Sequence, residues 1–400
     1  MIRRLLAALA CLSAAAPLAA QNAPPPATVV VAFDRDSVRP LIVEGLANKQ
    51  TGRAVEANDP VRIASISKLI MTLAMLRLMD EGKIDPNRDV SDYLGWRLRS
   101  PYRPDEPITL YHLLMHRAGL SDRAGYIIPL GESLQAKLAD PAAWRDPGTG
   151  QMPSFEYANL GSPLVATALE AASGERYDRL VERLVFAPLG VKACLNWLGC
   201  EEAMQARAVT LYRDTGEVAK DGPGELPPAC TIPLAEGQAC DLAAYKPGTN
   251  ASIFSPQGGV RIGMIDLAKI GQAMLRIDGK PGFLSVKAQT MWFQTMLTAL
   301  HHLPQDDSGF CGYGLGTYAL ANEPPCRDDL FGDGGRRFGH GGEAYGLRSG
   351  LWMSTDDDPT GIAYFTTEVP PPSGEVETAA SDPRETALMA RALAIAKLRE

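Results

Sequence analysis

Hydrophobic and polar positions divide the chain into a strand-rich beginning, a helix-rich middle and a strand-rich end. Two hydrophobic runs, 29–33 and 40–48, are separated by the charged segment 34–37. Short β-rich runs around a polar turn are typical of a β-hairpin. From Ser65 to about Gly82, hydrophobic residues cover more than one face of a helical wheel. Such a helix is buried.

Further helices are expected in the middle of the chain. The segments with helical periodicity are 107–120, 155–174 and 257–275. Residues 194–250 are rich in Pro, Gly and Cys and have little periodicity, so we expect irregular loops there.

The last ninety residues contain successive strand-like segments followed by an amphipathic helix at 382–398. The strand-like segments are 313–320, 338–342, 347–354 and 360–367. Strands that follow one another through short turns pair antiparallel. The pattern therefore predicts a mostly antiparallel sheet covered by helices, an α/β (α+β) arrangement.

The first twenty residues predict a secretory signal peptide. Arg3 and Arg4 precede a hydrophobic run that ends in small residues before Gln21. Pro17 interrupts the run too early for it to span a bilayer, and no later hydrophobic stretch approaches twenty residues. We expect cleavage after Ala20, with Ala16 as an alternative, and an exported bacterial protein, periplasmic or secreted, without a stable membrane span.

Cysteine content and charge fit this localisation. Six cysteines follow the leader as close neighbours in sequence: 194 with 200, 230 with 240, and 311 with 326. An even number in an exported chain predicts disulfides that close local loops, although the connectivity stays open. The formal charge of −8, without a basic stripe, argues against a nucleic-acid partner.

Ser65 and Lys68 are the strongest candidate for chemistry. Positions i and i+3 lie on one face of a helix, so Lys68 can fold back beside the Ser65 hydroxyl. A serine hydroxyl needs an adjacent base, which a desolvated lysine can supply. The alternative is a structural role, because a helix-capping serine followed by a surface lysine is common at this spacing.

Tyr157 and Asn159 form a second candidate, just before a helical run. Tyr157 can relay a proton, and Asn159 can hold a substrate amide or carbonyl. An aromatic packing anchor followed by a helix N-cap remains an alternative.

Histidines supply the remaining candidates. His340 is followed by Gly341 and Gly342 at the end of a strand, where glycines let a substrate approach and the N–H of Glu343 can point into the site. His112 and His116 have the i, i+4 spacing of metal ligands, but no third ligand is near, which favours a packed or capping pair. His-Gly-Gly also occurs in α/β-hydrolases, but the chain contains no G-x-S-x-G elbow.

Taken together, three motifs carry a resemblance: Ser65-Ile66-Ser67-Lys68, Tyr157-Ala158-Asn159 and His340-Gly341-Gly342. In this order and spacing they resemble the serine β-lactamase and penicillin-recognising hydrolase superfamily. The branch with class C β-lactamases, D-alanyl-D-alanine carboxypeptidases, D-aminopeptidases and related esterases is the most similar. Supporting stretches lie at 112–120, 186–191 and 255–270.

The resemblance implies a β-lactamase/transpeptidase-like fold with the active site between two parts. We expect a signal peptide at 1–20, a discontinuous α/β subdomain formed by 21–66 and 305–400, and a mainly α-helical subdomain at 67–304.

It also implies residue roles and needs no cofactor or metal. Ser65 would be the acylated nucleophile, and Lys68 with Tyr157 would move protons. Asn159 would hold the substrate amide, and the backbone N–H groups of Ser65 and Glu343 would form the oxyanion hole. The third motif of class C β-lactamases begins with lysine, so His340 implies a weaker grip on a substrate carboxylate.

The function expected from the sequence is therefore an exported serine hydrolase that acts on a small ester, amide or peptide through an acyl-enzyme. Esterase or D-amino-acid peptidase activity ranks above class C-type β-lactamase activity. A non-catalytic penicillin- or peptidoglycan-binding relative is the alternative from a different class. The substrate and the oligomeric state are not readable from the sequence.

Overall fold

The computed structural model describes residues 24–146, 148, 154–219, 221–222, 230–276, 282–301, 312–320, 326, 328–354, 360–370 and 382–397. The expected signal peptide at 1–20 lies outside these residues, as does Cys311.

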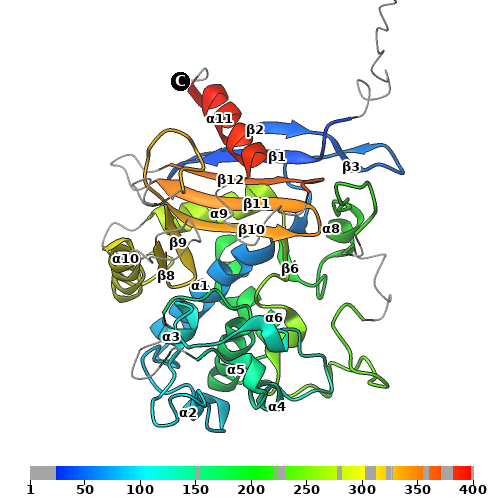
Figure 1. Ribbon diagram of the computed structural model, residues 1–400. Helices are drawn as coiled ribbons and strands as arrows, with labels where there is room; N and C mark the ends of the chain where they lie inside the picture. Colours follow the sequence, from blue (N-terminus) through cyan, green and yellow to red (C-terminus); the bar gives the residue numbers. More distant parts are fainter. Residues whose placement is uncertain are drawn as a thin grey trace, which may run out of the picture.

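A seven-stranded sheet with the strand order β2-β1-β12-β11-β10-β9-β8 forms the centre of the structure (Figure 1). Every neighbouring pair in it is antiparallel, which confirms the expected sheet. Its strands are β1 (Thr28–Phe33), β2 (Val38–Glu44), β8 (Gly312–Gly314), β9 (Thr317–Leu320), β10 (Arg337–Ala344), β11 (Leu347–Ser354) and β12 (Gly361–Thr366). The predicted hairpin is β1 and β2, and β12 joins it to the strands from the other end of the chain.

The single strand expected at 313–320 is instead a hairpin of β8 and β9. Gly316, with φ of 59°, lies in the turn between them. A Cβ at this position would lie 2.9 Å from the Lys68 carbonyl oxygen. Glycine therefore allows both the left-handed turn and its close packing against the helix that follows Ser65.

Helices cover both faces of the sheet, as expected. On one face, α11 (Pro383–Lys397) buries Leu388 and Met389 against sheet residues that include Trp352 and Tyr364. On the other face, α9 (Met264–Leu275) packs against β1, β11 and β12, and α10 (Val286–His301) packs against β8 and β9. Figure 1 shows α11 on one side of the sheet and α9 and α1 on the other.

The helical part lies beyond α1 (Ser67–Asp80) and is built around α5 (Gly161–Ser173), which contacts α1, α2, α3 and α6. Its other helices are α2 (Ser91–Leu94), α3 (Leu110–Leu114), α4 (Leu134–Leu138), α6 (Tyr177–Val181), α7 (Ala187–Leu189) and α8 (Glu202–Ala206). Two small sheets complete the fold: β3 (Leu46–Asn48) with β4 (Arg53–Ala54), and β5 (Val61–Arg62) and β6 (Ala193–Leu195) on either side of β7 (Val260–Ile262).

The predicted helix after Ser65 is present and buried, but its start differs. Residues Ala64–Ile66 form a 3-10 turn, and the α-helix begins at Ser67. Ala64 has φ of 45°, a conformation that is unfavourable for a residue with a Cβ. The tight turn separates Ser65 from the regular helix and places it on the rim of a cavity.

We propose that the fold divides into an α/β part and a helical part, as the sequence implied. The packing of α9 and α10 on the large sheet favours counting residues 264–301 with the α/β part, although the expected helical subdomain ran to 304.

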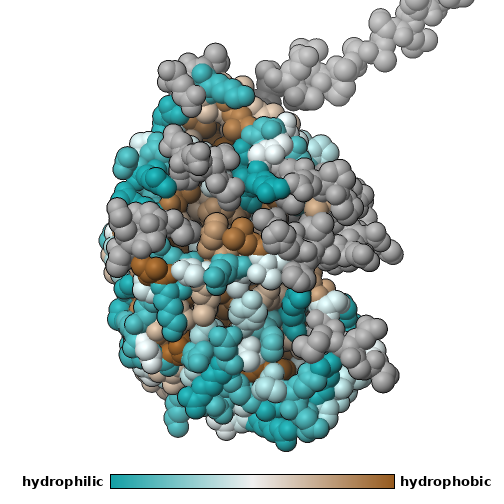
Figure 2. All heavy atoms as spheres, turned by 90° about the vertical axis from the view of Figure 1, so that its left-hand side faces the viewer, coloured by the Kyte–Doolittle hydropathy of each residue, from teal (hydrophilic) through white to brown (hydrophobic). Residues whose placement is uncertain are grey.

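The surface is mostly hydrophilic on the face shown in Figure 2, with smaller hydrophobic areas between the polar ones. Among the described helices, none is both long enough and hydrophobic enough to cross a membrane.

Candidate active site

Ser65 and Lys68 meet as the i, i+3 spacing predicted. The Lys68 Nζ lies 3.1 Å from the Ser65 Oγ. Lys68 also donates to the Asn159 Oδ1 at 2.7 Å and to the Gln257 carbonyl at 3.2 Å. These bonds hold the amine in one position beside the hydroxyl.

Burial changes the chemistry of this amine. The Lys68 side chain lies in the core, and desolvation lowers the pKa of Lys68 to about 7, although the nearby Asp122 carboxylate opposes that shift. A substantial fraction of Lys68 is therefore neutral near pH 7 and has a lone pair for a proton.

Tyr157 also hydrogen bonds with the Ser65 hydroxyl. The Lys68 Nζ lies 4.6 Å from the centroid of the Tyr157 ring. Burial raises the pKa of Tyr157, and the Asp122 charge adds to this, while the bond to Ser65 opposes it. Tyr157 therefore keeps its proton at neutral pH, which makes Lys68 the better base of the two.

Asn159 is fixed from both ends. Its Oδ1 accepts from Lys68, and its Nδ2 donates to the Asp122 Oδ2 at 3.0 Å. Asp122 also accepts from the backbone N–H groups of Asn159 and Leu160, at 2.8 and 2.9 Å. One amide hydrogen of Asn159 remains for a substrate carbonyl. Asn159 is not the helix N-cap, because α5 begins after Leu160.

His340 lies behind the reacting groups, in a chain of hydrogen bonds. Its Nδ1 donates to the Gly341 carbonyl at 2.5 Å, so in the neutral imidazole Nε2 is an acceptor. Tyr313 then donates its O–H to that nitrogen at 3.2 Å and accepts from the His116 Nε2 at 3.2 Å. The chain ends where the His116 Nδ1 accepts from the Ala158 N–H at 3.1 Å.

This chain ties the second motif to the third and leaves both imidazoles uncharged. Burial first, then repulsion by Lys68, lowers the pKa of His340 to about 3. Burial likewise lowers the pKa of His116 well below its usual range. The His340 side chain is 1% exposed, so it presents no positive charge to a substrate.

Strand β10 brings Gly342 and Glu343 next to Ser65. A Cβ on Gly342 would lie 2.3 Å from the Ile63 carbonyl oxygen, so glycine is required for this close approach. Glu343 pairs across the strands with Arg348, and their side chains form an ion pair at 3.0 Å. The Glu343 carboxylate is thus paired, and Glu343 lines the same cavity as Ser65.

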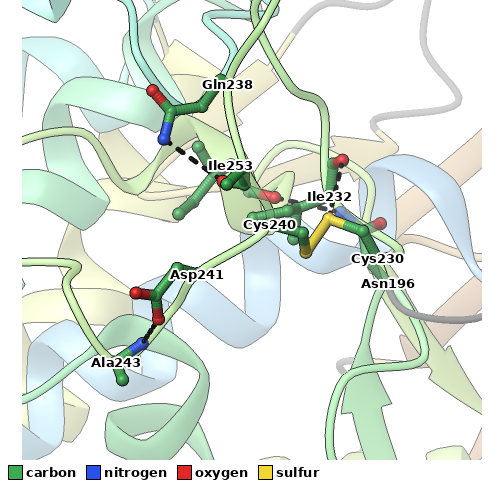
Figure 3. Close-up of a disulfide and its surroundings, with 9 residues drawn as sticks. Asn196, Cys230, Ile232, Gln238, Cys240, Asp241, Ala243 and Ile253 are labelled. Atoms are coloured by element: carbon green, nitrogen blue, oxygen red, sulfur yellow. Dashed lines mark hydrogen bonds between the residues drawn. A yellow bond between two sulfur atoms is a disulfide. The ribbon is translucent and has the colours of Figure 1, made fainter.

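A cavity of about 570 Å³ opens in front of Ser65. Asn159, Gln257 and Glu343 line it on the catalytic side. Cys230 and Ile232 also line it and are part of a loop closed by the Cys230–Cys240 disulfide (Figure 3). The volume suits a small organic ester, amide or peptide.

The disulfides follow the close pairing of cysteines in the sequence. Cys194 bonds to Cys200, and Cys230 bonds to Cys240. Cys326 is also disulfide-bonded, and Cys311, the cysteine nearest to it in the sequence, lies outside the described residues.

Sequence reasoning missed several residues of the site, including Asp122, Tyr313 and Gln257. Asp122 follows the predicted helix at 107–120 by two residues, but no spacing rule relates it to Asn159. The i, i+4 spacing relates His116 only to His112, but in the structure the two histidines make separate contacts. The His112 imidazole and the Thr109 side chain form a capping box at the start of α3. Among the described residues, no group of His, Cys, Asp and Glu side chains has the arrangement of a metal site.

Comparison with known proteins finds matches over most of the chain. The family model described as Beta-lactamase matches residues 15–383. Esterase EstB from Burkholderia gladioli is 28% identical over 266 residues, which cover 60% of this chain and 62% of that protein. The D-alanyl-D-alanine-carboxypeptidase/endopeptidase AmpH of Escherichia coli is 32% identical over 145 residues, covering 34% of this chain and 37% of AmpH.

The solved structure of D-amino acid amidase from Ochrobactrum anthropi SV3 has the same fold. It superposes with a TM-score of 0.64 at 18% identity and covers 96% of this chain and 95% of its own. The matches to EstB and AmpH span less than two thirds of those proteins.

Proposed function

The chain belongs to the Beta-lactamase family of serine hydrolases, and on that premise we propose that it is an exported enzyme that cleaves an ester or amide through an acyl-enzyme on Ser65. The single observation that carries the proposal is the 3.1 Å contact between the Ser65 hydroxyl and Lys68, an amine whose pKa is about 7. A hydroxyl held beside a partly neutral, fixed amine is an activated nucleophile.

In the proposed reaction, neutral Lys68 takes the Ser65 proton as Oγ bonds to the substrate carbonyl carbon. The carbonyl oxygen becomes negative and is stabilised by the backbone N–H groups of Ser65 and Glu343. The carbon–heteroatom bond then breaks, and the leaving group takes a proton that Tyr157 relays from Lys68. Water, deprotonated by the same lysine, cleaves the acyl–Ser65 ester and restores the serine.

The roles of the remaining residues follow from their contacts. Asn159 fixes Lys68 and has one amide hydrogen left for the substrate carbonyl, while Asp122 fixes Asn159. His340, Tyr313 and His116 hold the second and third motifs together without a charge.

We rank esterase or D-amino-acid peptidase activity above β-lactam hydrolysis. EstB is named an esterase and AmpH a carboxypeptidase, and both share sequence with this chain. A β-lactam carboxylate would find a buried neutral imidazole at the position where class C enzymes have a lysine. A purely binding role is disfavoured because Ser65, Lys68 and Tyr157 are arranged for proton transfer.

Hydrolysis of 4-nitrophenyl butyrate and D-alanine 4-nitroanilide, combined with intact mass spectrometry, tests the proposal. We expect turnover of at least one substrate, an acyl adduct that maps to Ser65, and a loss of roughly a thousandfold or more in Ser65→Ala. Ser67→Ala is the matched control, because the Ser67 Oγ accepts from the Val260 N–H and cannot replace the nucleophile. Wild-type turnover by Ser65→Ala, or an adduct on another residue, would contradict the mechanism.

Export is a separate part of the proposal. The disulfides among the described residues support an oxidising compartment. N-terminal sequencing of protein recovered from the periplasm of a bacterial host is expected to begin at Gln21. An intact Met1 in the folded, active protein would contradict the proposed signal peptide.

A further inference from the structure

Two guanidinium groups and one carboxylate form part of the wall of the Ser65 cavity. Arg62 comes from β5, three residues before the nucleophile, and Arg261 comes from the adjacent strand β7. Asp221 lies between them. Its Oδ1 accepts from the Arg62 Nε and the Arg261 NH2, both at 2.8 Å. All three side chains are largely buried, with exposed fractions of 13% for Arg62, 1% for Arg261 and 6% for Asp221.

The ion pairs of this wall leave one arginine without a carboxylate of its own. The described residues that line the cavity include four charged side chains: those of Arg62, Arg261, Asp221 and Glu343. Glu343 is paired with Arg348, outside the cavity wall. Within the described part of the chain, Asp221 is the one carboxylate that pairs with either Arg62 or Arg261. Among the described residues, the three arginines and two carboxylates of these ion pairs therefore carry one net positive charge beside the nucleophile, in a chain whose formal net charge is −8.

The groups around Arg62 and Arg261 leave both arginines positively charged at neutral pH. Burial and then repulsion by Arg62 lower the pKa of Arg261 to about 9, while Asp221 opposes the shift, so Arg261 stays charged at neutral pH. The Arg62 guanidinium lies 5.2 Å from the centroid of the Tyr345 ring, and the exposed Arg213 lies 5.9 Å from the same ring. Electron-rich aromatic faces stabilise cations without neutralising them.

The hydrolytic steps described above do not use these arginines, and the third motif contributes no cation because His340 is neutral and buried. A positive charge in a partly desolvated wall attracts an anion far more strongly than the same charge in water. Guanidinium groups bind carboxylates with strong charge-assisted hydrogen bonds.

We propose that Arg62, Arg261 and Asp221 form an anion-selective subsite, and that the substrate is an ester or amide that carries a free carboxylate. The proposal rests on Ser65 hydrolysis only for its kinetic test. The substrate carboxylate contacts Arg62, the more exposed of the two arginines. Arg261 supplies the positive charge that Asp221 does not neutralise.

A second cluster in the chain provides a control. Asp59 is buried and paired with two arginines, Arg53 at 2.6 Å and Arg207 at 3.4 Å, but none of these residues lines the cavity. As at Asp221, two arginines share one aspartate, so this cluster also carries one net positive charge. Removing a charge there tests whether an effect on selectivity arises from the cavity wall or from the charge of the whole protein.

The experiment compares each anionic ester with its neutral methyl ester. Any intrinsic difference in reactivity within a pair cancels when the ratio is compared between variants. The first pair, mono(4-nitrophenyl) glutarate and its methyl ester, places the carboxylate in the acyl part. The second pair, 4-acetoxybenzoate and its methyl ester, places it in the leaving group. The ratio of kcat/KM within a pair does not depend on the fraction of folded enzyme. We expect the wild type to prefer the anion in at least one pair.

Two variants move this ratio in opposite directions. Arg261→Gln removes the surplus charge and is expected to lower the ratio about tenfold, the order of the attraction between the substrate carboxylate and one nearby charge in a partly desolvated wall. Asp221→Asn doubles the surplus and is expected to raise the ratio, while Arg261→Lys and Arg207→Gln keep it near the wild-type value. A ratio that stays unchanged in both Arg261→Gln and Asp221→Asn, or that falls in both, overturns the subsite.

Binding to the Ser65→Ala protein separates this proposal from the proposed function. Ligand-observed NMR with monomethyl glutarate, and with dimethyl glutarate as the neutral control, needs no turnover. Binding of the anion that is lost in the Ser65→Ala/Arg261→Gln protein supports the subsite even if neither ester is hydrolysed. Equal binding of the two compounds overturns it, whatever the hydrolytic activity.

Discussion

At the scale of single residues, Lys68 shows how burial converts a common surface residue into a base. Three hydrogen-bond partners fix its amine, and desolvation lowers its pKa to about 7. A lysine accepts a proton only when it is neutral. Activity that depends on Lys68 must therefore rise with pH as the ammonium form is lost.

The first prediction concerns the pH dependence of hydrolysis, which should follow the loss of the Lys68 proton. We expect kcat/KM for a neutral ester to rise with pH through a midpoint near 7 and to level off above it. Asp122 raises the pKa of Lys68, so Asp122→Asn should move the midpoint to lower pH. Its overall rate should also fall, because Asn159 and Leu160 lose the carboxylate that orients them.

A pH–rate profile measures both effects. Asp105→Asn is the control, because Asp105 is almost fully exposed, and its profile should match the wild type. An Asp122→Asn midpoint at or above the wild-type value would show that Lys68 is not the group being titrated.

The residues of the three motifs were predictable because each is defined by its near neighbours in sequence. The i, i+3 rule predicted the contact between Ser65 and Lys68, and the resemblance placed Tyr157 and Asn159 with them. Asp122 and Tyr313 were not predictable, since their partners are 37 and 27 residues away. Such pairs depend on how loops cross in three dimensions, and no periodicity encodes them.

At the scale of elements, periodicity located most helices and strands, but local backbone geometry changed their ends. The expected helix from Ser65 begins at Ser67 because Ala64, in a left-handed conformation, starts a 3-10 turn that ends at Ile66. The expected strand at 313–320 folds into β8 and β9 around Gly316. Hydrophobic patterns report which face is buried, whereas a turn of one or two residues leaves that pattern nearly unchanged.

The C-terminal helix α11 carries the second prediction. Glu385 of this helix is 2% exposed and accepts from the Tyr364 hydroxyl of β12. Burial raises the pKa of Glu385 to about 8, while the bond to Tyr364 opposes the shift. Because the folded protein holds this proton more tightly than the unfolded chain, the stabilising effect is present at low pH. It is lost as pH rises between about 4.5 and 8, at up to about 1.4 kcal/mol per pH unit.

Glu385→Gln should remove this dependence, because the amide keeps an oxygen for Tyr364 and cannot ionise. We expect the variant to gain stability over the wild type as pH increases from 5.5 to 7.5, measured by urea unfolding. Glu44→Gln is a control, since the Glu44 carboxylate is paired at the surface with Arg391 and its pKa is lowered. A difference between Glu385→Gln and wild type that is constant with pH would contradict a buried, protonated Glu385.

At the scale of the whole molecule, the antiparallel sheet and its covering helices were predictable, but the way the chain ends meet was not. The sequence pattern predicted a hairpin at one end and successive strands at the other, and β1 and β12 join them through six residue pairs. Nothing in the alternation of either segment specifies that pairing. The resemblance to a known family supplied it through the expected discontinuous α/β part.

The last prediction concerns the Cys230–Cys240 disulfide, which constrains a loop that lines the cavity. It closes a loop of sequence separation 10 within the long irregular region, and Cys230, Thr231 and Ile232 line the cavity. Replacing both cysteines by serine should cost about 2–3 kcal/mol, the loop-closure entropy of a cross-link of this length. Without the disulfide, the cavity-lining residues 230–232 are less constrained, so KM for a neutral ester should rise. The kcat should stay near wild type, because no catalytic group lies on that loop.

Leu388→Ala separates the two effects. This core substitution in α11 should cost about 2–5 kcal/mol without touching the cavity, so KM should be unchanged although stability falls at least as far. A disulfide-free protein with wild-type KM would mean that contacts such as the bond from the Leu130 N–H to the Pro233 carbonyl hold the wall without the cross-link. A rise in KM confined to the cysteine variant would instead identify the disulfide as the element that keeps the cavity in shape for its substrate.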